Sequence, residues 1–198
     1  MSSLRTAAIL FTLLFALTGL AYPAAVLLVA GTAFPFQAHG SLVVAPDGRV
    51  TGSLLVGQVS TLPRYFQGRP SSTAGAPYNG AGSGGSNLGP TNPALLQDVE
   101  LRVQALQERG ISGPVPSDLV MASGSGLDPH LSLEAALLQV PVVAGARSIP
   151  EDQLRERVLS LAVYPAIPFS GPYVNVAALN RELDRWQGGD GHGFPGSS

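Results

Sequence analysis

The sequence contains no cysteine and no lysine. Without cysteine there can be no disulfide framework, no thiolate metal site and no cysteine nucleophile. All 11 basic residues are arginines, and charged residues make up only 12% of the chain, with a formal net charge of −2. This composition argues against a nucleic-acid-binding protein, which would carry a basic face.

One segment is long and apolar enough to cross a membrane. Residues 6–30 read TAAILFTLLFALTGLAYPAAVLLVA, without a single charge. A helix of this length would be about 37 Å long, which exceeds the roughly 30 Å hydrocarbon core of a bilayer. We therefore predict a transmembrane helix, kinked where Pro23 removes a backbone hydrogen bond. A cleaved signal peptide is the main alternative, although the apolar sequence continues well past a possible cleavage region. A buried helix of a soluble protein is a third interpretation.

The charge beside this segment predicts its orientation. Arg5 comes immediately before the segment, and basic residues favour the cytoplasmic side. We therefore expect residues 1–5 in the cytoplasm, a single-pass helix over residues 6–30 and an extracytoplasmic domain over residues 31–187. The glycine-rich residues 188–198 are expected to form a disordered tail. The chain would then lie in the inner cell membrane, in contact with lipid.

The domain is expected to be a small mixed α+β fold, with strands early and helices later. Residues 40–63 contain short apolar runs around Asp47-Gly48, which favours a hairpin turn. A helix then begins at Asn92-Pro93, where Asn92 can cap free N–H groups, and ends at Gly110. Spacings of three and four residues give this helix an apolar face: Leu96, Val99, Val103 and Leu106.

Three further helices follow from similar signals. One spans residues 132–139. The next begins at Ser148, since Ser-Ile-Pro-Glu is a capping-box pattern, and the last begins after Asn175. Their expected buried residues are Leu154, Val158 and Leu161 in the first of these two, and Val176, Leu179, Leu183 and Trp186 in the second.

A glycine-rich run at residues 80–89 raises the question of a phosphate site. Backbone N–H groups at Ser83, Gly84 and Gly85 could cradle a phosphate. The run lacks the Gly-Lys-Ser/Thr ending of a P-loop, and no βαβ frame surrounds it. An ordered loop leading to the Asn92 cap is the simpler interpretation, with direct nucleotide binding as an alternative.

The string MASGSGLDPHLS at residues 121–132 brings two serines close to Asp128 and His130. A serine hydrolase using Ser123 or Ser125 with His130 is therefore an alternative function. Asp128 and His130 are too close in the chain to orient each other in the usual triad manner, and the G-x-S-x-G elbow is absent. We expect them to satisfy local backbone groups in a turn. No histidine has partners at zinc-ligand spacing.

The segment RYFQGRPSS combines aromatic and arginine side chains in a loop. Such residues are typical of protein contact sites, and they could equally anchor the loop in the core. We interpret residues 65–92 as an ordered docking or scaffold loop, whose glycines permit close backbone approach.

Seven strings, taken in order, resemble one family: the C subunit of the bacterial Kdp potassium-transporting ATPase. They are GLAYPAAV, GSLLVGQ, YFQGRPSS, YNGAGSGGSNLGPTNPAL, ASGSGLDPHLS, QVPVVA and VNVAALN, and the resemblance covers residues 10–186. Two places depart from the family pattern. Val142 stands where the family usually has arginine, and residues 161–173 replace a His-Thr-Glu-Gly-like segment.

The resemblance implies a non-enzymatic accessory subunit of a high-affinity, ATP-driven potassium uptake complex. Its partners would be the potassium-conducting membrane subunit and the P-type ATPase subunit. The family is described as chaperone-like, stabilising assembly and supporting ATP binding by the ATPase subunit, so ATP would be bound through that partner and no cofactor directly. Residues expected to serve partner contact or structural motifs are Gln58, Tyr65, Phe66, Arg69, Asn87, Asn92, Asp128, His130, Asn175 and Asn180.

Overall fold

The computed structural model describes residues 2–45, 48–166 and 171–188. The chain forms two compact units, residues 1–51 and residues 52–198. The predicted tail falls almost entirely outside the described residues.

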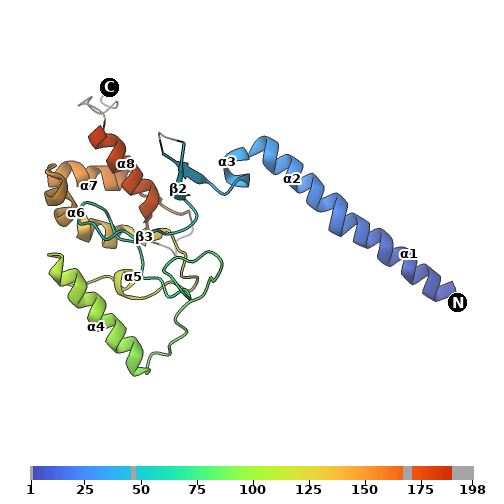
Figure 1. Ribbon diagram of the computed structural model, residues 1–198, viewed down its shortest axis with the longest axis horizontal. Coiled ribbons are helices and arrows are strands. Elements are labelled where there is room, and N and C mark those ends of the chain that lie inside the picture. The colour runs from blue at the N-terminus through green and yellow to red at the C-terminus, as the bar shows by residue number, and fades with distance from the viewer. Residues whose placement is uncertain (1, 46–47, 167–170, 189–198) are drawn as a thin grey trace. The chain divides into compact units, whose positions relative to one another are not determined.

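The first unit is dominated by one long apolar helix (Figure 1). It consists of α1 (Ser2–Ala16), a π-helical turn (Leu17–Ala21) and α2 (Tyr22–Ala33). The stretch Ser3–Ala33 is long and apolar enough to cross a membrane, and it is longer than the predicted residues 6–30. At Pro23 the expected disturbance takes the form of the π-helical turn, in which the Tyr22 N–H donates to the Leu17 carbonyl.

A short helix and a hairpin complete this unit. The helix α3 (Pro35–Ala38) precedes strands β1 (Leu42–Val44) and β2 (Val50–Ser53), which form a two-stranded sheet. Backbone hydrogen bonds from Ala45 to Arg49 and from Gly48 to Ala45 close the predicted hairpin, although Asp47 lies outside the described residues. The strands are much shorter than the expected residues 40–63, because the chain after Ser53 turns away into irregular structure.

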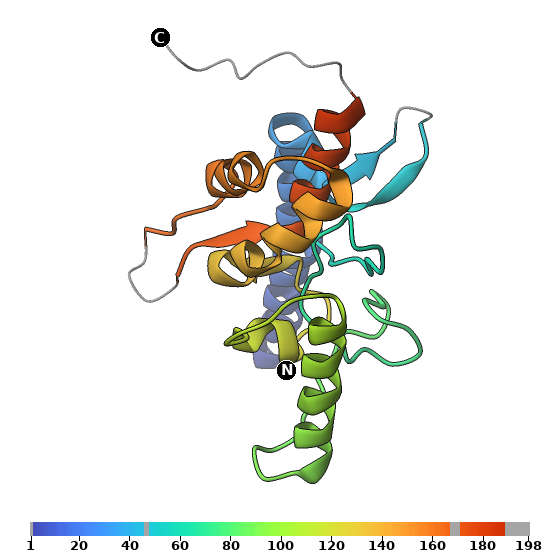
Figure 2. The same ribbon diagram turned by 90° about the vertical axis from the view of Figure 1, so that its left-hand side faces the viewer.

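The second unit is a mixed α+β domain with short strands. Its helices are α4 (Pro93–Glu108), α5 (Ser117–Val120), α6 (Leu133–Arg147), α7 (Glu151–Ser160) and α8 (Val176–Gly188). Strands β3 (His130–Ser132) and β4 (Tyr173–Asn175) pair antiparallel, with Leu131 opposite Val174. In both ribbon views α4 lies at the opposite end of this unit from α7 and α8 (Figure 1 and Figure 2). The predicted α+β fold class is confirmed, while the β3–β4 pair was not predicted.

Three helix starts are confirmed by side-chain caps. Asn92 accepts the Ala94 N–H at 3.0 Å at the start of α4, and Asn175 accepts the Ala178 N–H at 2.9 Å at the start of α8. Ser132 accepts the Ala135 N–H at 3.1 Å and begins α6, where a helix start was expected. Gly110, with φ of +86°, follows the end of α4 as predicted, since glycine adopts this conformation without steric cost.

Helix α6 is longer than predicted. It continues through Pro141 to Arg147, whereas the sequence pattern suggested an end at residue 139. Proline removes an N–H donor, so the Leu137 carbonyl loses its partner four residues later. The helix persists because both sides of this point are anchored in the core: Val140 and Val143 are fully buried. Val142, where the family pattern has arginine, packs against the edge of the same core.

The predicted capping box at Ser148 is wrong. Ser148 has φ of +56° and ends α6, since its N–H bonds to Ala144 and Gly145 carbonyls of the preceding helix. Helix α7 begins two residues after Ile149, with Pro150 at the cap position and no side-chain cap. The residues expected to be buried nevertheless include Leu154 and Val158, both fully buried.

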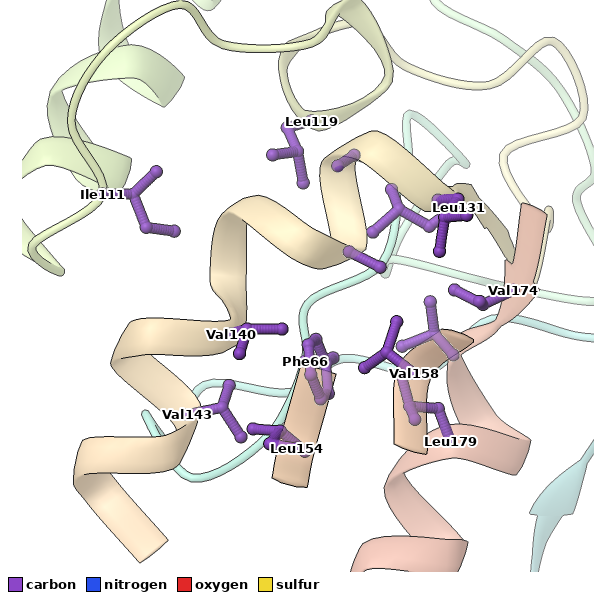
Figure 3. Packing of buried hydrophobic residues seen from close by; sticks show 14 of the residues in the cluster. Phe66, Ile111, Leu119, Leu131, Val140, Val143, Leu154, Val158, Val174 and Leu179 are labelled. Carbon is purple, nitrogen blue, oxygen red and sulfur yellow. The ribbon is translucent and has the colours of Figure 1, made fainter. Parts of the chain in front are cut away.

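One core gathers the second unit around Phe66 (Figure 3). Phe66 is 0% exposed although it lies on an irregular segment. Its ring lies among Val140, Leu154 and Val158, so α6 and α7 both contribute to its pocket. The buried leucines and valines of α8 and the β3–β4 pair close the rest of the core: Leu131, Val174, Val176, Leu179 and Leu183.

Helix α4 contacts this core with only part of its expected apolar face. Leu106 is buried, and Val99 and Val103 pack against the core. Leu96, by contrast, is 59% exposed, so only part of the predicted apolar face is buried. The N-terminal part of α4 extends past the other helices and strands of the unit (Figure 2), which leaves that side chain mostly exposed.

Pro141 provides a direct test of the helix assignment. We expect Pro141→Ala to raise the free energy of unfolding by about 1–2 kcal/mol, because the new N–H restores a helical hydrogen bond and the exposed ring contributes little packing. Chemical denaturation of the detergent-solubilised chain, followed by circular dichroism, measures this change. A lower stability for Pro141→Ala would show that the proline is favourable at this position.

Candidate functional site

The candidate site is built on residues 64–69, which we call the strap. The strap has no neighbouring strand, yet its backbone is paired. The Asn180 side chain accepts the Phe66 N–H and donates to the Phe66 carbonyl, both at 2.9 Å. Gln139 does the same for Gln67, accepting its N–H at 2.8 Å and donating to its carbonyl at 3.1 Å. Two side-chain amides, from α8 and α6, thus take the place of a partner strand.

A charged cluster fixes the N-terminal end of the strap. The Arg147 side chain is fully buried and donates to the Arg64 carbonyl at 2.6 Å and to Asp184 at 2.8 Å. Its guanidinium also lies 4.9 Å from the centre of the Tyr65 ring, a cation–π contact. The Tyr65 hydroxyl donates to the other Asp184 oxygen at 3.0 Å. Burial and the bond to Asp184 raise the pKa of Tyr65.

The C-terminal end of the strap is held by an ion pair. Arg69 donates to Asp128 at 3.1 Å, with both side chains about a quarter exposed. The other Asp128 oxygen accepts the His130 N–H at 3.0 Å and lies 3.3 Å from the His130 ring Nδ1. The His130 ring packs edge-on against Tyr173 of β4 at 4.9 Å. The expected role of Asp128 in satisfying a local turn is therefore confirmed, and the residue also holds Arg69.

The glycine-rich loop after the strap packs on residues 123–129. The Gly84 N–H donates to the Ser125 carbonyl at 2.9 Å, and the Ser83 hydroxyl donates to the same atom at 3.0 Å. Ser71 bonds the Gly126 carbonyl at 2.7 Å and accepts the Tyr78 N–H at 2.8 Å. The region is thus an ordered layer of two loops, as the sequence suggested.

Two glycines make this layer possible. A Cβ on Gly57 would lie 2.3 Å from the Tyr78 ring and 2.9 Å from the Asp128 carbonyl, and the Gly57 N–H donates to Leu127. Gly126 has φ of +67°, and a Cβ there would lie 2.6 Å from the Gly84 carbonyl. Any side chain at either position would push the two loops apart.

The Tyr78 side chain is half-buried, and its hydroxyl donates to the Arg69 carbonyl. Burial, together with the nearby Asp128 charge, raises the pKa of Tyr78. The strap and the glycine-rich loop are therefore tied together by a phenol that is neutral at ordinary pH.

A shallow, open depression of about 520 Å³ lies where these segments meet. Arg69 and Asp128 form part of its wall, and the rest of its lining comes from residues 123–129 and from Leu55. Exposed apolar side chains lie on the segment that borders it, with Leu55 59%, Val59 60% and Leu62 54% exposed. The lining residues are Leu55, Arg69, Ser123, Gly124, Ser125, Leu127, Asp128 and Pro129.

Several residues singled out from the sequence have structural partners. Phe66 is a core anchor, and Asn175 both caps α8 and donates to the Leu54 carbonyl at 2.7 Å. The exposed Asn87 adopts φ of +53°, a conformation that asparagine tolerates better than most residues. The Gln58 side chain lies directly over Gly52, where a Cβ would touch its amide.

The residues proposed for phosphate binding and for serine chemistry have other contacts. The Gly84 N–H and the Ser83 hydroxyl both point to Ser125, so neither is directed at a ligand. The Ser125 hydroxyl accepts the Leu127 N–H at 3.1 Å, and Ser123 is only 3% exposed. Among the described residues neither serine hydroxyl is hydrogen-bonded to His130. The described part of the chain also contains no group of three metal-ligating side chains.

Sequence reasoning missed Gln139, Arg147 and Asp184. Gln139 is 1% exposed and is the one polar residue in the run LLQVPVV, which was the available signal of a buried partner. Arg147 and Asp184 belong to no motif that the sequence analysis singled out. Their pairing across 37 residues has no local pattern in the sequence.

These features define a class of protein: a small α+β domain, in a chain that begins with one helix able to cross a membrane. The chain belongs to the KdpC family, whose family model, described as the K+-transporting ATPase c chain, matches residues 4–185. The resemblance seen in the sequence motifs is therefore confirmed over nearly the same residues.

Close relatives cover almost the whole chain. Potassium-transporting ATPase KdpC subunits from Methanosphaerula palustris and Sorangium cellulosum are 50% and 51% identical to it. These matches cover 92% and 93% of this chain, and 97% and 98% of the relatives. The KdpC subunit of Geobacter sulfurreducens is 46% identical, over 93% of this chain and 98% of its own.

The amide pairing of the strap is tested by Asn180→Ala. This change leaves the Phe66 N–H and carbonyl without partners, so we expect the free energy of unfolding to fall by about 2–4 kcal/mol. Asn180→Asp keeps the acceptor but loses the donor, and should give a smaller loss. Gln104→Ala, an exposed amide on α4, is the control and should change stability by about 0.5 kcal/mol or less. Equal effects of Asn180→Ala and Gln104→Ala in denaturant titrations would contradict the assigned role.

The raised pKa of Tyr78 leads us to expect that the free energy of unfolding decreases at alkaline pH. This pKa is higher in the folded than in the unfolded chain, so the contribution of Tyr78 is complete below about pH 10 and is lost as pH rises above that value. The chain has no lysine or cysteine, whose side chains would otherwise titrate in the same alkaline range. We expect the midpoint temperature of thermal unfolding to decrease as the pH is raised from about 9.5 to about 11, the range in which a tyrosine side chain ordinarily titrates. Tyr78→Phe should make that fall shallower.

The control for this experiment is Tyr164→Phe. The Tyr164 side chain is 65% exposed, so this variant should lose stability with pH as steeply as the unmodified chain does. A slope in Tyr78→Phe identical to that of Tyr164→Phe would remove Tyr78 as the source of the alkaline sensitivity.

Proposed function

We propose that this chain is a non-catalytic, membrane-anchored accessory subunit of an ATP-driven potassium uptake complex. Its partners are the potassium-conducting membrane subunit and the P-type ATPase subunit. It stabilises their assembly and supports ATP binding and turnover by the ATPase subunit without binding nucleotide itself. The main support is the family match over residues 4–185, together with one helix able to span a membrane.

The sequence favours an extracytoplasmic position for the domain. Arg5 comes before the uncharged residues 6–30, and basic residues are enriched on the cytoplasmic side of membrane helices. Residues 1–5 would then be cytoplasmic and residues 31–187 extracytoplasmic. ATP and its binding domain would lie across the membrane, so any effect on ATP turnover has to pass through the span and the partner subunits.

A supporting role agrees with how the loops are fastened. The N–H of Gly84 is used within the protein, as are the hydroxyls of Ser83 and Ser125. The strap and the glycine-rich loop instead form a fixed surface beside the open depression. We propose that this surface, together with the exposed Leu55 and Leu62 of the segment that precedes the strap, contacts the potassium-conducting subunit. Exposed apolar side chains next to an arginine are typical of such contacts.

The absence of cysteine makes a clean topology experiment possible. Arg155→Cys places one thiol on α7, where the Arg155 side chain is 43% exposed, and Ser3→Cys places one at the N-terminal end of the span. We expect a membrane-impermeant maleimide to label Arg155→Cys in intact spheroplasts, and to label Ser3→Cys only after the membrane is permeabilised. Labelling in the reverse order would place the domain in the cytoplasm. Loss of the Ser3→Cys thiol from the mature chain would show that the segment is a cleaved signal peptide.

The docking surface is tested by a double variant, Leu55→Ser with Leu62→Ser. Both side chains are exposed, so the domain should stay folded while apolar contact area is lost. We expect co-purification with the potassium-conducting and ATPase subunits to fall about tenfold or more, since central contacts contribute about 1–2 kcal/mol each. Leu101→Ser on α4, which is 57% exposed, is the matched control. Unchanged yield of the complex from the double variant would place the contact elsewhere on the domain.

A further inference from the structure

The membrane span contains a backbone carbonyl that its own helix does not satisfy. In an α-helix the Thr18 carbonyl would accept the Tyr22 N–H, but that N–H donates to Leu17 instead. In a π-helical turn the donor would be residue 23, which is Pro23 and has no N–H. The Thr18 carbonyl has therefore lost both its α-helical and its π-helical donor.

The hydroxyls of the span do not replace these donors. Those of Thr12, Thr18 and Thr32 donate to the carbonyls of residues four positions earlier, at 2.8–2.9 Å. The Thr18 hydroxyl in particular is turned toward Leu14, in the opposite direction along the helix from its own carbonyl. The neighbouring side chains of the π-helical turn, Leu17, Gly19, Leu20 and Ala21, carry no donor.

The depth of this carbonyl determines what can satisfy it. Thr18 is the middle residue of the 31-residue stretch Ser3–Ala33, so it lies near the centre of a bilayer that this helix crosses. Water and lipid headgroups are absent at that depth, and an unpaired carbonyl in hydrocarbon is costly. A donor has to come from another protein segment in the membrane.

The helix surface is open at this point. Thr18 and Tyr22 are exposed, with Tyr22 at 68%, and neither the π-helical turn nor α2 contains a buried residue. Gly19 has no side chain, and a Cβ there would meet only the Phe15 ring, at 3.7 Å. A second helix can therefore approach the backbone closely beside the freed carbonyl.

We propose that the Thr18–Pro23 turn is the docking site for a transmembrane helix of another subunit of the complex. That helix presents a neutral hydrogen-bond donor, such as a serine, threonine, asparagine or glutamine side chain, to the Thr18 carbonyl. The proposal rests on the proposed function, because it requires membrane partners. It adds the place on the span at which a partner is recognised and the chemistry that recognises it.

The test compares Pro23→Ala with Thr12→Val in the intact complex. Pro23→Ala returns an N–H to the helix and satisfies the freed carbonyl internally, so co-purification with the other membrane subunits in mild detergent should fall about threefold to eighteenfold. Thr12→Val removes the same kind of hydroxyl bond to a carbonyl four residues earlier, but outside the Thr18–Pro23 turn, and should co-purify normally. Equal recovery of Pro23→Ala and the unmodified chain would overturn the proposal, as would an equal loss in Thr12→Val.

If the Pro23→Ala chain does not enter the membrane, a crosslinking experiment tests whether the Thr18–Pro23 turn contacts another subunit. A photoreactive phenylalanine analogue replaces either Tyr22, on the same side of the helix as the Thr18 carbonyl, or Leu20, on the opposite side. We expect crosslinks to another subunit from position 22 and at least about threefold fewer from position 20. Crosslinks only to lipid, only to a second copy of this chain, or equally from both positions would overturn the proposal. Failure of the unmodified chain to co-purify with any membrane subunit would instead refute the proposed function.

Discussion

The second unit depends on the pairing of two side-chain amides with the backbone of the strap. Residues 54–92 contain almost no regular structure, so their N–H and carbonyl groups have no ladder to join. Asn180 and Gln139 supply a substitute at Phe66 and Gln67, which allows a fully buried aromatic ring to sit on an irregular segment. Burying that ring without these bonds would leave partly buried backbone groups unpaired, and the cost would offset much of the hydrophobic gain. The core and the loop therefore form together.

This arrangement explains how a glycine-rich loop becomes a fixed surface. The strap is held at one end by buried Arg147 with Asp184 and at the other by the Arg69–Asp128 pair. The glycine-rich loop then packs backbone to backbone on residues 123–129, at distances that only glycine allows at positions 57 and 126. Polar groups that resemble a phosphate cradle or a catalytic cluster are used to build the layer. A surface so fastened suits recognition of a partner subunit better than chemistry on a small molecule.

Local signals in the sequence predicted the parts of the fold that depend on local interactions. Asn92, Ser132 and Asn175 were recognisable caps because the capping bond joins residues two or three positions apart. The continuation of α6 through Pro141 and the left-handed Ser148 were not predictable, since core packing on both sides overrides the local preference. Tyr65, Phe66, Arg69, Asp128 and Asn180 of the candidate site were named from the sequence, whereas Gln139, Arg147 and Asp184 were missed. The bonds that join the strap to its partners were not predictable, because those to Gln139 and Asn180 span 72 and 114 residues.

Both units contain backbone groups that lack regular secondary-structure partners, but the surroundings of these groups differ. In the domain the irregular strap is close to helices that carry amide side chains, and water is available at the edges, so the chain satisfies itself. In the span Pro23 disrupts an otherwise regular helix, and the π-helical turn re-pairs Tyr22 but leaves the Thr18 carbonyl. Hydrocarbon offers no donor, and the span carries no free amide. A chain that is self-sufficient in one unit and incomplete in the other is suited to a subunit, because its membrane helix reaches its lowest free energy only beside a neighbour.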